Sequence, residues 1–426
     1  MPPNIHVAPE ERSRQQHLRH NLTVNILEGT CYWIGVAFYS YQTVLPLFVS
    51  KLTGSPFALG LIAMAGNSGW LLPQIFTARW VQRTPVKKHI VVRVGFFSER
   101  LPIVLLALVT WLLASLSPRT ALAVTLVLAV WGAYGAGLIA VAWQSMIAKI
   151  IPQTMRGRFI GFTSALGMAG SAVAAVGVTY ILNTWPFPMN FAFSFTAGAL
   201  FTLLSWGLIS LTREWPDPTP AGADSTPWWR QIWAVVQADR RFVRFIVARA
   251  VAAAAMMGVG FLTVYAVQRW RLSDGYAGVF NGVASAAQLI AYALLGPLAD
   301  RRGHKLVLEI GALASGMAFI VAALTPWPQL VYLSFAGLGI MQAAYIVSSM
   351  MIVPEFAPAE QLPLYFGIGS TVPGLISMSA PLVGAAVVTL WGYSAVFVLS
   401  GVAGLTAWYL YRHHVPDPRQ VYRTSN

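Results

Sequence analysis

Residues 296–305 read Gly-Pro-Leu-Ala-Asp-Arg-Arg-Gly-His-Lys, and a long apolar segment lies on each side of them. This concentration of charge on a short hinge is unusual, because an ionisable side chain is costly in hydrocarbon. A hinge of this kind between two membrane helices has to lie at a membrane surface, where it joins one helix to the next. The stretch therefore bears on the class of protein and on its topology together.

The composition favours membrane helices on both sides of this hinge. The chain has 426 residues, of which 57% are apolar and 10% charged, whereas about a quarter of the residues are charged in soluble globular proteins. Apolar runs of about 18 residues or more predict twelve spans, six in each half of the chain. Those of the first half are 22–50, 56–78, 89–115, 120–148, 158–183 and 190–211, and those of the second are 243–268, 276–299, 306–325, 330–353, 364–390 and 393–411.

The distribution of Lys and Arg predicts the orientation. With both termini placed in the cytoplasm, 21 of the 28 Lys and Arg residues fall on the inner side, 4 on the outer side and 3 within spans. This bias follows the positive-inside rule. It also accounts for the formal net charge of +14 without a nucleic-acid partner, since a basic inner face is attracted to anionic lipid. We expect a multi-pass protein of the cell inner or plasma membrane.

Cysteine and histidine usage argues against disulfides, metals and enzymatic chemistry. Cys31 is the only cysteine and lies inside the first predicted span, which excludes an intrachain disulfide. All seven histidines fall on or near the predicted inner face, and we find no nucleotide-binding loop and no catalytic constellation. We therefore expect no metal, no cofactor and no enzyme. The polar first 20 residues lack a cleavable-signal pattern, so we expect the first span to remain in the mature protein.

An internal repeat divides the spans into two sets of six. At an offset of 218 positions Gly60 aligns with Gly278, Arg83 with Arg301 and Lys87 with Lys305. The only long interior loop, with chain breakers throughout its first half, lies between the two sets. We predict a cytoplasmic tail over 1–21, a six-helix bundle over 22–211, a cytoplasmic linker over 212–241, a second six-helix bundle over 242–411 and a cytoplasmic tail over 412–426.

The 296–305 stretch resembles the cytoplasmic signature of the major facilitator superfamily, G-x-L-A-D-R-x-G-[RKH]-[RK], which joins the eighth and ninth helices of a twelve-helix transporter. The loop that begins at Pro152, Pro-Gln-Thr-Met-Arg-Gly-Arg, is similar to the family's P-x-x-x-R-G-x pattern. Parallel halves of six helices are expected in this superfamily. The resemblance implies an all-α membrane protein with twelve transmembrane helices in two pseudo-symmetric six-helix bundles.

The resemblance also implies that the signature is a cytoplasmic gate that latches when a transporter faces outward. We expect Gly296 to let spans 8 and 11 approach closely and Gly303 to permit a tight turn. Asp300 is expected to meet the positive N-terminus of a neighbouring helix, and Arg301 to pair with Asp300 or with the end of a neighbouring span. The gate motif further includes Lys305, Arg83 and Arg156. A hinge that only anchors the topology is the alternative.

Ionisable residues inside the predicted spans are candidates for proton coupling. Glu28 lies about six residues into span 1, on a polar and aromatic stripe with helical spacing. A partly desolvated carboxylate there could exchange protons, or it could be a structural acid paired with a basic neighbour. Arg249 lies at a similar depth in span 7, so the two residues could meet across the bundle interface as a second inner gate.

Glu99 and Arg100 lie near the middle of span 3 and are the remaining coupling candidates. Adjacent residues on a helix point about 100° apart, so we expect them to seek different partners. Arg93 shares a face with Arg100, seven residues away. Span 3 is peripheral in the family, so a structural network of buried ions is favoured here over a coupling role.

In the superfamily, spans 1, 4, 7 and 10 line the central cavity. Polar and aromatic residues on these spans are therefore substrate-cavity candidates, with packing between helices as the alternative for each. They are Asn25, Tyr32, Tyr39, Gln42, Trp143, Gln144, Thr263, Tyr265, Gln342, Tyr345 and Ser349. Aromatic and amide side chains suit a lipophilic or amphipathic organic molecule.

These observations favour a secondary active transporter that works as a monomer by alternating access. Proton-coupled efflux of a small lipophilic solute is the favoured activity, although span 5 lacks the proline of the family's antiporter pattern. An uptake symporter or facilitator, a lipid transporter of the same fold, and a non-transporting membrane receptor or scaffold are the alternatives. The expected partners are a small-molecule substrate, the lipid bilayer and protons.

Overall fold

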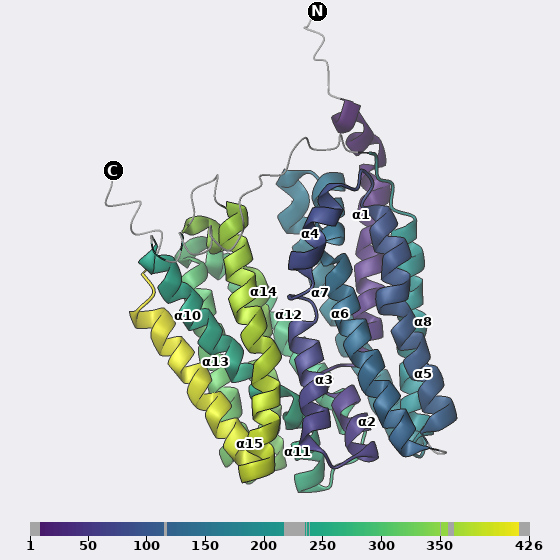
Figure 1. The fold of residues 1–426 in the computed structure, drawn as a ribbon, viewed down its shortest axis with the longest axis vertical. Helices are drawn as coiled ribbons and strands as arrows, with labels where there is room; N and C mark the ends of the chain where they lie inside the picture. The colour runs from purple at the N-terminus through teal and green to yellow at the C-terminus, as the bar shows by residue number, and fades with distance from the viewer. Residues whose placement is uncertain are drawn as a thin grey trace, which may run out of the picture.

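A computed structural model describes residues 9–114, 117–216, 235, 237, 239–349, 351–356 and 362–416. Within these ranges every regular element is a helix. Most of the predicted linker and parts of both predicted tails lie outside the described residues. The first residues of α1 and the last residues of α15 lie at the same end of the molecule (Figure 1), called here the terminal end; the opposite end is called the far end.

The helices of the first half form one side of the molecule in Figure 1. Its first two predicted spans are each built from two helices in succession, and its third begins with two π-helical turns, η1 and η2. The elements are α1 (Pro9–Phe38), α2 (Val44–Leu52), α3 (Pro56–Ser68), α4 (Gln74–Gln82), η1 (Ile90–Val94), η2 (Phe96–Arg100), α5 (Leu101–Leu113), α6 (Pro118–Ile150), α7 (Gln153–Thr184) and α8 (Met189–Ser210).

The helices of the second half form the other side. The elements are α10 (Arg240–Ala254), the 3₁₀ turn η3 (Ala255–Gly258), α11 (Val259–Trp270), α12 (Tyr276–Arg302), α13 (His304–Leu324), η4 (Pro328–Leu330), α14 (Val331–Ser348), η5 (Val353–Glu355) and α15 (Leu362–His413). Gly392 adopts a φ of 81° inside α15, a conformation that glycine reaches without a steric penalty. It divides α15 into two arms, which are the eleventh and twelfth spans.

The prediction of twelve membrane helices is confirmed, although nine helices of the described residues are long and apolar enough to cross a membrane one by one. The difference arises from α15, whose two arms count as one helix, and from the two broken spans of the first half. In the second span α3 ends at Ser68 and Pro73 follows. Proline lacks an amide hydrogen and its ring clashes with the carbonyl four residues earlier, so the helix restarts at Gln74 as α4.

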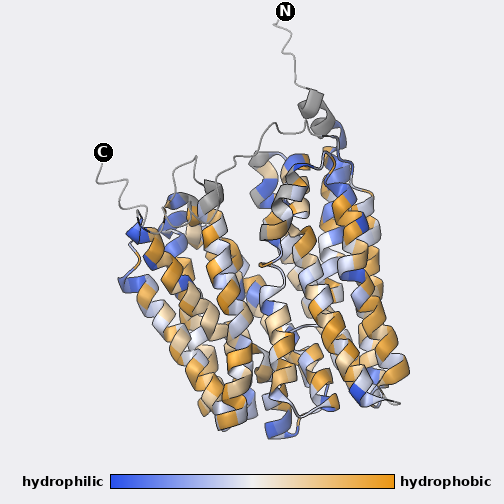
Figure 2. Ribbon diagram, in the orientation of Figure 1, coloured by the Kyte–Doolittle hydropathy of each residue, from blue (hydrophilic) through white to orange (hydrophobic). Residues whose placement is uncertain are grey.

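The side chains that face outward are suited to lipid. Large apolar residues are widely exposed, among them Val173 (73%), Leu200 (63%) and Leu294 (66%). In water such surfaces would mark interaction sites or aggregation hazards, whereas hydrocarbon solvates them. Hydrophobic residues run along the helices and hydrophilic ones gather towards the two ends (Figure 2), as a membrane-spanning bundle requires.

The two bundles meet along α7 and α12, and along α3 and α15. Polar contacts join them near the far end and also within the bundle, where the hydroxyls of Ser171 on α7 and Ser285 on α12 lie 3.1 Å apart. Nζ of Lys51 is 2.7 Å from Oδ1 of Asp274, and the amide of Gly275 donates a 3.1 Å hydrogen bond to Oδ1 of Asn183. At the terminal end, by contrast, the ion pairs of Lys305 with Glu309 and of Lys149 with Glu214 each stay within one bundle.

Candidate functional site

Five polar side chains converge inside the first bundle and are called here the Glu28 cluster. They are Glu28 and Tyr32 of α1, Glu99 and Arg100 of η2, and Ser205 of α8. Glu99 forms a short ion pair with Arg100 and accepts a 2.8 Å hydrogen bond from the hydroxyl of Tyr32. The guanidinium of Arg100 also lies over the ring of Tyr32, with its Cζ 5.6 Å from the ring centroid. The cluster thus joins spans 1, 3 and 6.

The π turns of span 3 position Glu99 and Arg100. A π turn inserts an extra residue into the helix and is common at functional sites. At this level α6 crosses span 3 in backbone contact, since a Cβ added to Gly135 would overlap the carbonyl oxygen of Ser98. The hydroxyl of Ser98 also donates a 3.1 Å hydrogen bond to the carbonyl of Gly135.

The expectation that Glu99 and Arg100 seek different partners is wrong, because they pair with each other. Arg93 does not share the buried face of Arg100 either, since its side chain is exposed. The pairing arises because two long side chains on neighbouring positions can bend toward each other, whereas the misplaced face of Arg93 has a helical cause. The prediction assumed 100° per residue throughout, whereas two π turns change the rotation between positions 93 and 100.

Glu28 differs from Glu99 in having no direct ion-pair partner among the described residues. It is 5% exposed, and its Oε1 accepts a 3.0 Å hydrogen bond from Ser205. The charge of Arg100 acts on it from a greater distance. The cluster therefore holds two carboxylates and one guanidinium, an excess of one acid in an apolar setting. A buried carboxylate without a partner is stable when it takes up a proton or when a cation approaches.

A second polar group lies in the other bundle and is called here the Arg249 cluster. Arg249 of α10 is buried, and its guanidinium donates 3.2 Å hydrogen bonds to the carbonyl oxygen of Ser349 and to the hydroxyl of Tyr345. Its Cζ lies 5.4 Å from the ring centroid of Tyr345 and 5.9 Å from that of Phe245. Glu28 and Arg249 thus contact different partners in different bundles, and the expected pair between them is not formed in this structure.

The gate motif is formed only in part. Gly303 has a φ of 97° between α12 and α13, so the turn that we expected at this glycine is present. Gly296 is different, because a Cβ added there would meet no described residue within 4 Å; among the described residues, the expected close approach of spans 8 and 11 is therefore absent at this point. Asp300 and Arg301 are exposed.

Lys305 contacts a residue that the sequence reading missed. Its Nζ lies 3.6 Å from Oε1 of Glu309 and donates a 3.3 Å hydrogen bond to the carbonyl of Arg412. Arg412 in turn lies 3.4 Å from Oε2 of Glu309, so this buried acid joins α13 to the end of α15. The four-residue spacing of Lys305 and Glu309 is a helix ion-pair signal that could have identified the pair.

The first-half members of the gate motif have separate roles. Arg83 is exposed. Arg156 donates to the carbonyl oxygens of Ile151 and Ala148. A cation at this place satisfies carbonyls at the end of α6 and complements the negative end of its dipole.

The substrate-cavity candidates do not form one site. Tyr32 belongs to the Glu28 cluster, while Tyr345 and Ser349 belong to the Arg249 cluster. Thr263 of α11 donates a 3.1 Å hydrogen bond to the carbonyl of Gln42, which joins the two bundles. The other candidates either make contacts within one bundle or are half-buried: Asn25 bonds to Thr212, Tyr39 packs on Tyr41, Trp143 on Trp70 and Tyr265 on Tyr393, while Gln144 and Gln342 are half-buried.

The fold and these two buried clusters define the class of protein: a polytopic membrane protein of two six-helix bundles, each with ionisable groups inside. The family model described as Major Facilitator Superfamily matches residues 245–425. A crystal structure of the nucleoside transporter NupG has the same fold, with a TM-score of 0.70 and 13% identity over 93% of this chain and 99% of that one. The second half of the chain is therefore similar to the major facilitator superfamily, and the chain as a whole has the fold of NupG.

Two curated relatives are similar over shorter regions. The multidrug resistance protein MdtG of Serratia proteamaculans is 24% identical over 270 residues, which cover 62% of this chain and 64% of the relative. A chloramphenicol resistance protein of Pseudomonas aeruginosa is 34% identical over 119 residues, 27% of each chain. The matched regions therefore span less than two thirds of either relative.

Proposed function

We propose that the protein is a secondary active transporter that exports a small lipophilic or amphipathic solute in exchange for protons. It works as a monomer in the cell inner membrane, with both termini in the cytoplasm. The predicted units 22–211 and 242–411 rock against each other about a site at mid-membrane, and the segment 212–241 links them. No step requires a cofactor.

The observation that carries this proposal is the setting of Glu28. This acid is buried, held by one hydroxyl and not directly paired, while the neighbouring acid, Glu99, already neutralises Arg100. Glu28 is therefore the group that binds and releases a proton, and Arg100 is the cation that favours release. Tyr32 donates a hydrogen bond to Glu99, so the ion pair of Glu99 with Arg100 is connected to span 1, which also carries Glu28 and lines the cavity in this family.

Alternating access gives the two ends of the molecule opposite roles. Contacts such as Lys51 with Asp274 close the bundles together at the far end. The excess of Lys and Arg near the termini supports assigning this end to the outer side. The open space at Gly296 among the described residues fits a released gate on the inner side. The conformation is then the inward-facing one, with the gate motif engaging only after the bundles rock.

The class of substrate follows from side-chain chemistry. Half-buried aromatic and amide groups on spans 1, 4 and 10, among them Tyr32, Trp143 and Gln342, suit an organic molecule with apolar surface and a few polar atoms. The relatives named for multidrug and chloramphenicol resistance support the same class and the outward direction.

The test is flux in proteoliposomes containing the full-length protein. A lipophilic fluorescent cation and a panel of phenicol and nucleoside compounds are loaded, and efflux is followed with and without an imposed pH gradient. We expect efflux to accelerate with the gradient in the wild type and to lose that response in Glu28→Gln. Glu309→Gln is the comparison, because it removes a buried carboxylate outside the Glu28 cluster. Its total flux should fall with the loss of the contact to Lys305 of the gate motif, but the acceleration of efflux by the gradient should remain.

Each other outcome assigns a different function. Gradient-driven accumulation inside the vesicles would indicate an uptake symporter, and equal flux with and without the gradient a facilitator. Movement of a labelled lipid between leaflets would indicate a lipid transporter. Absence of any flux would indicate a receptor or scaffold on the same fold.

A further inference from the structure

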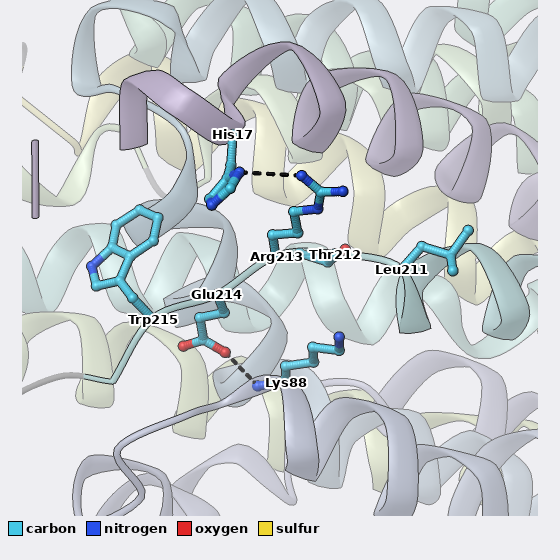
Figure 3. A pocket seen from close by; sticks show the side chains of 7 residues that line it. All are labelled: His17, Lys88, Leu211, Thr212, Arg213, Glu214 and Trp215. Carbon is cyan, nitrogen blue, oxygen red and sulfur yellow. Dashed lines mark hydrogen bonds between the residues drawn. The ribbon is translucent and has the colours of Figure 1, made fainter. Parts of the chain in front are cut away.

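A pocket of about 290 Å³ opens at the terminal end of the first bundle. His17 of α1, Lys88 at the start of span 3 and the segment 211–215 after α8 line it. Figure 3 shows this segment running between the side chains of His17 and Lys88. The volume is close to the lower end of the range for small-molecule sites, so a compact polar group fits it.

The wall formed by this segment is held rigidly on α1. Asn21, which is fully buried, donates a 2.9 Å hydrogen bond to the carbonyl of Arg213 and accepts one of 2.9 Å from its amide. One turn later Asn25 donates a 3.1 Å hydrogen bond to the hydroxyl of Thr212. A wall fixed in this way loses little conformational entropy when a ligand binds. This clamp also explains why Asn25, a cavity candidate in the sequence, faces the chain after α8.

The pocket carries an excess of positive charge. The carboxylate of Glu214 accepts hydrogen bonds of 3.1 and 2.6 Å from the backbone amides of Lys87 and Lys88, and it lies 3.3 Å from Nζ of Lys149. Its charge is therefore already balanced. By contrast, the ammonium group of Lys88 makes no hydrogen bond to a described residue. Among the described residues, the guanidinium of Arg213 has one hydrogen-bond contact, of 3.4 Å to Nδ1 of His17 (Figure 3).

We propose that this pocket binds a phosphate-bearing anion between Lys88 and Arg213. A guanidinium presents a planar fork of donors that matches phosphate oxygens, and an ammonium adds a point charge. The half-buried ring of Trp215 at the rim suits the interfacial depth at which aromatic residues gather, and basic pockets at this level receive phospholipid headgroups. The phosphate group belongs either to an anionic lipid or to a soluble phosphate compound.

The test uses the full-length protein in detergent and native mass spectrometry. Phosphatidylglycerol and phosphatidylcholine are titrated separately, and inorganic phosphate is added in a third arm as a competitor. The variant Lys88→Gln/Arg213→Gln should bind the first phosphatidylglycerol on the order of 10- to 30-fold more weakly, because each basic side chain near anionic lipid contributes to binding. Lys88 holds Glu214 through its backbone amide, so this contact survives the substitution.

The matched control is Arg158→Gln/Arg240→Gln, which removes the same charge from exposed positions at the same end. The proposal is supported, with a lipid as the source, if phosphatidylglycerol binds the control variant as tightly as the wild type but binds the pocket variant more weakly. The variant Lys88→Arg/Arg213→Lys should then recover the affinity. If inorganic phosphate binds to the wild type but not to the pocket variant, and phosphatidylglycerol shows no such difference, the proposal is supported with a soluble phosphate compound as the source. Equal affinity in the pocket and control variants would overturn it, whatever the transport assays show.

Discussion

The hydroxyl of Ser205 donates a 3.0 Å hydrogen bond to Oε1 of Glu28, so that α8 holds a buried acid of α1. Hydrogen bonds to charged groups contribute about 1.5–3 kcal/mol. Ser205→Ala should therefore lower the melting temperature of the purified protein by on the order of a few degrees, whereas Ser205→Thr, which keeps the hydroxyl, should lower it less.

The same contact predicts non-additive behaviour in a double-mutant cycle. If Ser205 acts through Glu28, then Ser205→Ala should have little further effect on thermal unfolding in the Glu28→Gln background. Strictly additive shifts would show that the serine stabilises the bundle by another route.

The crossing of α6 over span 3 gives a second prediction. A Cβ at Gly135 would overlap the carbonyl of Ser98. This carbonyl belongs to the backbone of η2, so it cannot rotate out of the way as a side chain could. Gly135→Ala should cost about 1–3 kcal/mol of stability, the usual range for overpacking, and should displace the ion pair of Glu99 with Arg100. The measurement is thermal unfolding together with flux.

A glycine in open space on a neighbouring helix is the control for this substitution. A Cβ added to Gly161 of α7 meets nothing within 4 Å, and alanine is the better helix former by about 1 kcal/mol. Gly161→Ala should be neutral or stabilising. Equal destabilisation by the two substitutions would mean that the crossing is not in close contact.

The far-end ion pair gives a third prediction. Lys51 is 37% exposed in its side chain, and a pair of this kind contributes only about 0.2–1 kcal/mol. That is enough to change the ratio of two conformations by up to about fivefold. Lys51→Gln should therefore shift the protein towards outward-facing forms, with little change in unfolding.

Distances between spin labels on the terminal ends of α6 and α15 measure this shift in a Cys31→Ser background. The swap Lys51→Asp/Asp274→Lys should restore the wild-type distance distribution. If Lys51→Gln leaves the distance distribution unchanged, the ion pair does not help to hold the outer side closed.

The sequence predicted the fold better than the site, for physical reasons. Apolar length and charge bias depend on composition averaged over about 20 residues, so they survive the break at Pro73 and the turn at Gly392. The pairing of Glu99 with Arg100 depends instead on local helix geometry. Nothing in the residue pattern predicted the two π turns, and the bending of the two long side chains toward each other depends on the three-dimensional surroundings.

Contacts between residues far apart in the chain were the other feature that could not be predicted from the sequence. Ser205 lies 177 positions from Glu28 and has no distinguishing motif. Glu214 follows the last span of the first bundle and reads as the start of a linker, yet it caps span 3 and pairs with Lys149. Its role depends on three helix ends meeting in space, which one-dimensional spacing cannot express.

The gate motif gives a fourth prediction. Asp300 is exposed in this conformation, and the superfamily resemblance gives it a role only when the inner side closes. Asp300→Asn should therefore reduce flux strongly while membrane insertion and melting temperature stay close to the wild type. The measurement is flux per inserted molecule, and normal turnover would leave the stretch as a topological hinge.

Gly296 distinguishes a gate from a hinge more sharply, because its surroundings must change during the cycle. A Cβ fits here without contact in the present structure, so Gly296→Ala should leave the melting temperature unchanged or raise it slightly. If spans 8 and 11 approach closely when the inner side closes, the added methyl group blocks that approach. Flux should then fall, and spin-label distances should show the inward-facing form accumulating. Full activity in Gly296→Ala would mean that the two spans never meet at this residue, and the closing contact would have to be sought elsewhere on α12.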